Sequence, residues 1–164
     1  MLFQMGRVAV KDLLTGNSDR LCELRKDKKD NTITLRISFN TGNLMLDPND
    51  GISQARMVCI DNGMSLRLSN EEFQSGIDSH FNSLPDKLWE RLKKDHFTPE
   101  VFSSTKAYQA HLEVHPNCDD EFRSWLREGI NAGLSDLKTC NENQLPNDSP
   151  LLRDRLAILK KVAT

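Results

Sequence analysis

No long run of hydrophobic residues and no strong excess of either charge occur in this sequence of 164 residues. A membrane-spanning helix needs about 20 consecutive, mostly apolar residues, and no window of the chain approaches that length. With 22 basic and 24 acidic side chains, the formal net charge is only −2. We therefore expect neither an integral membrane protein, nor a strongly basic nucleic-acid binder, nor a disordered acidic tail.

The sequence also lacks a signal peptide and any paired spacing of cysteines. Its first ten residues show neither the basic start nor the apolar stretch of about 7–15 residues that a signal peptide has. The four cysteines are Cys22, Cys59, Cys118 and Cys140, and a chain of this length can fold without disulfides. We expect reduced thiols and a cytoplasmic or other reducing intracellular compartment, although export without a cleaved signal would leave no trace here.

Between about residues 20 and 68, apolar and polar side chains alternate, as they do in a strand with one buried face. Residues 32–39 are the clearest case, because every second side chain is apolar from Ile33 onward. Residues 21–26 lie before them across a polar turn. That segment either pairs with residues 32–39 as a hairpin or forms a short helix.

A second hairpin is predicted around Asp61, Asn62 and Gly63. An Asn-Gly pair adopts the positive φ angles that a tight hairpin turn requires. Residues 56–60 and 64–68 flank this turn and would be its two strands. In total, we expect an N-terminal antiparallel sheet of three to five strands.

After residue 68 the apolar residues follow the 3.6-residue period of helices. Ser69 and Glu72 have the spacing of a capping box, which marks the start of a helix. About five helices are predicted, beginning near Ser69, Pro85, Thr98, Asp119 and Ser149. Strands followed by helices indicate an α+β fold, with the helices packed on the sheet and on each other. We expect a single domain over residues 1–164, with a β-rich part at 1–68 and a helical part at 69–164.

The segment HLEVHPNC contains the residues best spaced for chemistry. His111 and His115 would lie on one helix face about 6 Å apart, and Cys118 follows, so the three could bind zinc. Helical zinc hydrolases also need a glutamate beside one of the histidines, but Glu113 lies midway between them. Cys118 could instead be a nucleophile, with one of the four histidines, such as His111, as its base. The competing interpretation is that these histidines flank the core and bind no metal.

A basic run from Arg25 to Asp30 is the feature that indicates a nucleic-acid or phosphate contact. Asp27 and Asp30 interrupt the basic residues, and the run has no aromatic side chain on which a base could stack. A solvated turn between two strands explains the same residues.

Aromatic residues make up only 6% of the chain, and most of the large ones in the helical part have a place in the predicted core. Trp and Tyr are nevertheless favoured anchors at protein interfaces. Trp89, Trp125 and Tyr108 are therefore the candidates for contact with a partner.

No Gly-x-Gly or Gly-Lys-Ser/Thr phosphate loop and no other complete catalytic or cofactor signature occurs in the sequence. We therefore favour a non-enzymatic protein-binding module, such as a regulator, adaptor or inhibitor, whose partner is another protein. The first alternative is a small hydrolase or transferase centred on His111, His115 and Cys118, with zinc as its metal. The second alternative is a regulator that binds nucleic acid.

Overall fold

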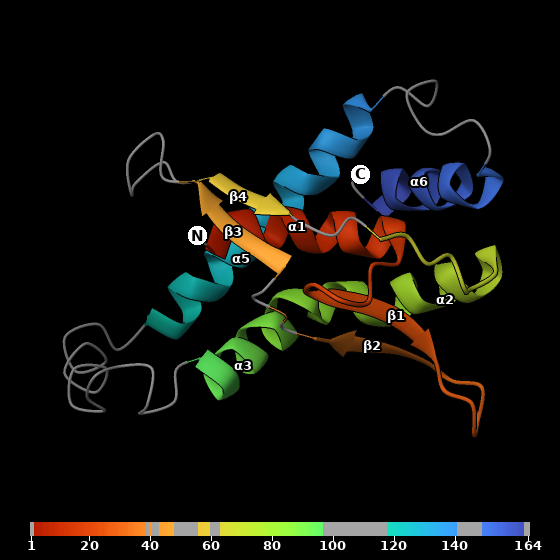
Figure 1. The fold of residues 1–164 in the computed structure, drawn as a ribbon, viewed down its shortest axis with the longest axis horizontal. Coiled ribbons are helices and arrows are strands. Elements are labelled where there is room, and N and C mark those ends of the chain that lie inside the picture. Colours follow the sequence, from red (N-terminus) through yellow and green to blue (C-terminus); the bar gives the residue numbers. More distant parts are fainter. Residues whose placement is uncertain are drawn as a thin grey trace.

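The computed structural model describes residues 2–38, 40, 43–47, 56–59, 63–96, 118–140 and 149–162 (Figure 1). In chain order its elements are α1 (Leu2–Thr15), β1 (Cys22–Lys26), β2 (Ile33–Ile37), β3 (Leu44–Asp47), β4 (Arg56–Cys59), α2 (Asn70–His80), α3 (Leu84–His96), α5 (Cys118–Thr139) and α6 (Pro150–Val162). One turn of 3-10 helix, Phe81–Ser83, joins α2 to α3. Antiparallel strands combined with helices make this an α+β fold, as the sequence predicts.

The first element, α1, is a helix, although the sequence predicts a β-rich part over residues 1–68. Leu2, Met5, Ala9 and Leu13 recur every three or four residues in α1, and all four are buried. A glycine and an arginine interrupt this period, and nearby valines favour strands, so the local propensities obscure it. Burial of the apolar face of α1 against other helices outweighs those propensities.

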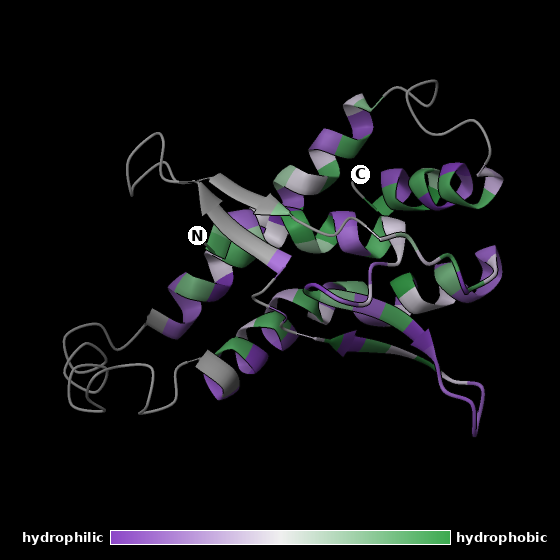
Figure 2. Ribbon diagram, in the orientation of Figure 1, coloured by the Kyte–Doolittle hydropathy of each residue, from purple (hydrophilic) through white to green (hydrophobic). Residues whose placement is uncertain are grey.

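β1 and β2 form the first of the two predicted hairpins. The strands are antiparallel, with Leu24 opposite Leu35. Side chains along β2 alternate between half-buried and exposed, which confirms the period-two pattern. The alternative of a short helix over residues 21–26 is therefore wrong. Figure 2 shows that the turn between β1 and β2 is hydrophilic, in agreement with a solvated hairpin end.

β4 pairs with β3 and not with residues 64–68, so the predicted hairpin around residues 61–63 is wrong. Leu44 of β3 is opposite Cys59 of β4. Of the predicted turn, residues 61 and 62 lie outside the described residues. Among the residues that the structure describes, the strands form two separate two-stranded sheets rather than one sheet of three to five strands.

Residues 64–68 instead pass beside the C-terminal end of α1. The backbone N–H of Ser65 donates to the carbonyl oxygen of Thr15 at 3.0 Å. Gly16 follows α1 with a φ of 64°, and a Cβ at this position would lie 2.1 Å from the carbonyl oxygen of Ser65. Only glycine combines this left-handed conformation with so close an approach. Residues 64–68 thus contact the end of α1, and β4 pairs with β3.

Four of the five predicted helices, namely α2, α3, α5 and α6, lie among the described residues and begin close to the predicted positions. The capping box of α2 is formed, because the Ser69 hydroxyl accepts the Glu72 N–H and the Glu72 carboxylate accepts the Ser69 N–H. The helix predicted to start near Thr98 lies outside the described residues. No helix in the described part is both long enough and apolar enough to cross a membrane.

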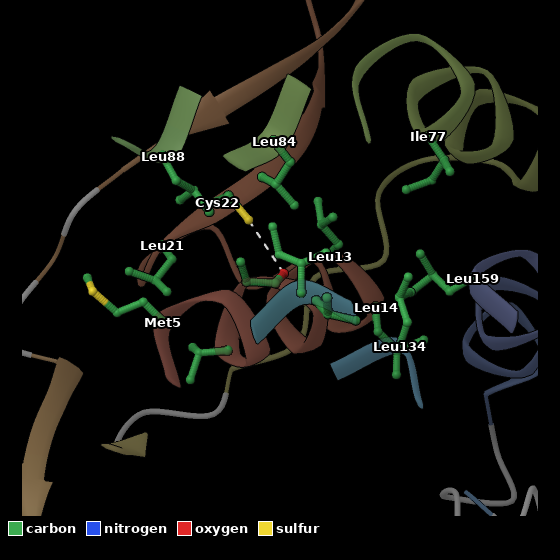
Figure 3. Packing of buried hydrophobic residues seen from close by; sticks show 14 of the residues in the cluster. Met5, Leu13, Leu14, Leu21, Cys22, Ile77, Leu84, Leu88, Leu134 and Leu159 are labelled. Atoms are coloured by element: carbon green, nitrogen blue, oxygen red, sulfur yellow. Dashed lines mark hydrogen bonds between the residues drawn. The ribbon is translucent and has the colours of Figure 1, made fainter. Parts of the chain in front are cut away.

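The hydrophobic core surrounds α1, and it includes residues from both the first and the second half of the chain. In Figure 3, Leu13 and Leu14 of α1 lie among side chains that come from β1, α5 and α6. The most extensive helix contact of α1 is with α5, which crosses it (Figure 1). At this crossing the two backbones meet at Gly6 and Gly129.

A buried ion pair connects α1 to the segment that leads into β1. Arg20 Nε donates to Asp12 Oδ1 at 2.7 Å, and the backbone N–H of Leu21 donates to Asp12 Oδ2 at 3.0 Å. Both charged side chains are completely enclosed. Burial raises the pKa of Asp12 to about 6, although the hydrogen bond from Arg20 lowers it. The carboxylate is therefore costly to ionise and depends on Arg20 for compensation.

The Asp12 carboxyl is expected to titrate with a midpoint near pH 6 in the folded protein. Because this pKa lies above the unfolded value of 3.8, the folded state retains a proton that the unfolded state releases. The contribution of Asp12 to the free energy of unfolding is thus fully present below pH 4 and decreases by about 3 kcal/mol as the pH rises through 6. Carboxyl ¹³C NMR would test this, and a midpoint below pH 4 would contradict it.

Candidate functional site

Three aromatic rings, one from α3 and two from α5, form a continuous row that we call the aromatic row: Trp89, Phe122 and Trp125. The centroids of Trp89 and Phe122 are 5.0 Å apart, with the rings edge to face, and those of Phe122 and Trp125 are 5.4 Å apart. These are favourable distances for aromatic pairs. Trp89 is fully buried, Phe122 is half-buried and Trp125 is 40% exposed. The row therefore extends from the core to the surface.

The surface around Trp125 is acidic along α5. Glu121 and Glu128 lie four residues before and three residues after Trp125, which places them on the same side of the helix. Both glutamates are exposed. Trp125 is thus an exposed aromatic ring between two carboxylates.

A second exposed aromatic residue lies at the start of α1. Gly129 follows Trp125 by one helical turn, and a Cβ at Gly129 would lie only 1.9 Å from the carbonyl oxygen of Phe3. The first turn of α1 therefore lies directly against this part of α5. The Phe3 side chain is 37% exposed.

An ion-pair network holds α3 and α5 together beside the aromatic row. Lys93 Nζ lies 2.9 Å from Asp119 Oδ2 and 5.8 Å from the centroid of the Trp89 ring. The hydrogen bond to Asp119 raises the pKa of Lys93, and Glu90 adds to the effect. Arg123 bridges the same helices, with its Nε 3.7 Å from Asp86 Oδ1. These contacts position Phe122 and Trp125 relative to Trp89.

The structure separates the three predicted contact residues. Trp125 is exposed, whereas Trp89 is buried and supports Phe122 from beneath. Tyr108 lies outside the described residues. The sequence does not indicate the exposed Phe3, because Phe3 lies on α1, which the sequence does not predict to be a helix.

Most of the predicted metal or catalytic site is not placed. His111 and His115 lie outside the described residues, and Cys118 is the first residue of α5, with a side chain that is not described. Within the described part of the chain, no group of three side chains is arranged to hold a metal ion. The zinc and nucleophile hypotheses remain predictions from the sequence.

Cys22 and His80 have structural surroundings. Cys22 is buried and its Sγ donates to the carbonyl oxygen of Ala9 at 3.5 Å. Burial raises the pKa of the Cys22 thiol well above its usual value, which disfavours the reactive thiolate. The His80 ring places Nε2 2.8 Å from the carbonyl oxygen of Ile33, where it joins α2 to β2. Cys22 and His80 thus serve packing rather than a catalytic pair.

Comparisons of this chain with protein-family models, with curated proteins and with solved structures give no match. A function is therefore inferred from the surface of the protein itself.

Proposed function

We propose that this protein is a non-enzymatic protein-binding module whose contact surface is centred on Trp125. The observation that carries the proposal is an exposed tryptophan that the aromatic row holds in place. Tryptophan is among the residue types most enriched at the energetic centres of protein interfaces, which a polar rim surrounds. A regulator, adaptor or inhibitor would use such a surface.

The ring of Trp125 is already ordered before any partner binds. Phe122 contacts one side of it, and Phe122 in turn contacts the buried Trp89. Ordering a free side chain at an interface costs about 0.5–1.5 kcal/mol, so a ring held in this way binds with a smaller entropic loss. This arrangement supports a role in binding over one in packing, since the exposed part of Trp125 contributes little to the core.

The charges beside Trp125 indicate what the partner presents. Glu121 and Glu128 would attract lysine or arginine side chains, which raises the rate of association and disfavours acidic partners. A partner segment with one apolar anchor and flanking basic residues fits this surface.

Replacement of Trp125 by alanine is expected to weaken partner binding by roughly 30-fold, which corresponds to a loss of about 2 kcal/mol. The fold should be retained, because the ring is substantially exposed and its removal leaves the buried Trp89 in place. To identify the partner, a photo-crosslinking phenylalanine would be placed at position 125 in the producing cells. The affinity of the identified partner for the Trp125→Ala variant would then be measured by calorimetry.

Asn131 provides the matched control for this experiment. It is exposed on α5 but lies on a different side of the helix from Trp125. We expect a discrete cross-linked product from position 125 and none from position 131. The proposal fails if both positions yield the same products, or if Trp125→Ala binds the identified partner as tightly as the wild type does.

A further inference from the structure

A groove of about 720 Å³ runs between α1, the C-terminal half of α5, the start of α6 and β4. Figure 1 shows β4 beside α1, and the two elements are in contact. This volume falls within the range of about 300–1,000 Å³ that small-molecule sites have. The groove is separate from the surface around Trp125, which lies on the N-terminal half of α5.

The walls of the groove are mainly apolar. Val8 and Leu14 contribute from α1, Leu137 from α5 and Leu152 from α6. Their positions are rigid, because Val8, Leu14 and Leu152 belong to the hydrophobic core and Leu137 packs against it. Such walls suit a hydrocarbon chain or ring.

One wall also carries charge from two successive turns of α1. Arg7 and Lys11 both line the groove. The Asp136 carboxylate, the acidic group of the groove, accepts hydrogen bonds from Arg7 at 2.9 and 2.5 Å and is thereby neutralised. Lys11 forms no ion pair with a carboxylate of the described residues. Among the charged residues that line the groove, Lys11 therefore provides one positive charge in excess, next to the apolar walls.

We propose that this groove binds a small amphipathic monoanion, namely an organic carboxylate with an apolar chain or ring. Lys11 pairs with the carboxylate, and the four apolar side chains contact the remainder of the molecule. A dianionic head such as a phosphate would find only one uncompensated cation, so a monoanion matches the charge better. This proposal is independent of the protein-binding function, because the two surfaces share no residue.

Cys59 gives the groove a chemical reporter. Its half-buried side chain lines the groove from β4. A ligand in the groove should therefore slow the alkylation of Cys59 by iodoacetamide, which peptide mapping by mass spectrometry can follow. The alkylation of Cys140, which does not line the groove, provides the reference in the same sample.

The test uses the full chain with decanoate as the probe and decyltrimethylammonium as a cation of the same chain length. We expect decanoate to bind once per chain by calorimetry and to slow Cys59 alkylation at least fivefold. Lys11→Glu should weaken decanoate binding by about tenfold or more, because it replaces attraction with repulsion. Lys28→Glu, which changes an exposed lysine in the turn between β1 and β2, should alter binding less than twofold.

Three results would overturn the proposal: no protection of Cys59 by decanoate, equal binding of the ammonium compound, or equal binding by the Lys11→Glu variant. Lys11 is exposed, so its replacement should leave the fold intact, and circular dichroism would verify this. Failure of the groove proposal would leave the Trp125 experiment unaffected, and the converse also holds.

Discussion

Replacement of Gly129 by alanine is expected to destabilise the protein by roughly 3 kcal/mol or more. Ordinary overpacking of a core costs about 1–3 kcal/mol, so this loss would lie at or above the upper end of that range. The added Cβ would lie 1.9 Å from the carbonyl oxygen of Phe3 and 2.7 Å from its carbonyl carbon. These atoms belong to the backbone of α1, so no side-chain rotation relieves the clash. Alanine favours helices over glycine by about 1 kcal/mol, which offsets only part of the loss.

Gly133→Ala is the matched control, one turn later on the same face of α5. Its Cβ would lie 3.1 Å from Val10 Cβ and 3.2 Å from Arg7 Cα, so a small adjustment accommodates it. We expect Gly133→Ala to change the free energy of unfolding by less than about 1 kcal/mol, since the gain in helix propensity compensates. Urea denaturation of both variants would decide the matter, and equal stabilities would show that the α1–α5 crossing yields easily.

Replacement of Arg20 by methionine is expected to cost about 3–5 kcal/mol at pH 8, because it leaves a buried carboxylate without its counterion. Arg20 is 1% exposed, and methionine retains much of its length. The hydrogen bond and charge of Arg20 lower the pKa of Asp12, so in the variant this pKa rises further above the unfolded value of 3.8. The free energy of unfolding of the variant should then decrease as the pH rises from about 4 through the folded-state pKa of Asp12, which is higher than in the wild type.

The loss caused by Arg20→Met should therefore be smaller at pH 5, where Asp12 takes up a proton and becomes neutral. Arg7→Met provides the control, because Arg7 pairs with Asp136 and both side chains are exposed, by 40% and 54%. Exposed pairs contribute about 0–1 kcal/mol, so this variant should differ little from the wild type at either pH. Chemical denaturation at the two pH values measures both effects. A loss from Arg20→Met that is equal at pH 5 and pH 8 would exclude the role assigned to Asp12.

The elements with strong local signals could be predicted from the sequence. The alternation around Ile33 and Leu35 predicts β2, and the capping box of Ser69 and Glu72 predicts the start of α2. In both cases the information lies within a few neighbouring residues: a period of two for a strand, and a hydroxyl and a carboxylate three residues apart for a helix start. Such signals act before distant contacts form.

The candidate surface could be predicted only in part. Trp89 and Trp125 both lie on helices with an apolar stripe, and their local surroundings in the sequence are similar. The structure buries Trp89 between α3 and α5, whereas Trp125 lies on the side of α5 that the described residues leave partly exposed. Which of the two tryptophans is exposed depends on which helix faces other elements cover. The packing of the helices decides this, and no local sequence pattern does.

The sequence by itself determined the α+β class, the strand β2 and the starts of four later helices, because periodicity and capping are local. The tertiary structure decided that α1 is a helix, that β4 pairs with β3, and that Asp12 meets Arg20. The helix α1 is buried against α5, which is distant in the chain, whereas the other two contacts join neighbouring segments whose meeting no local pattern indicates. The free energy of such burial exceeds local propensities of at most about 1 kcal/mol per residue.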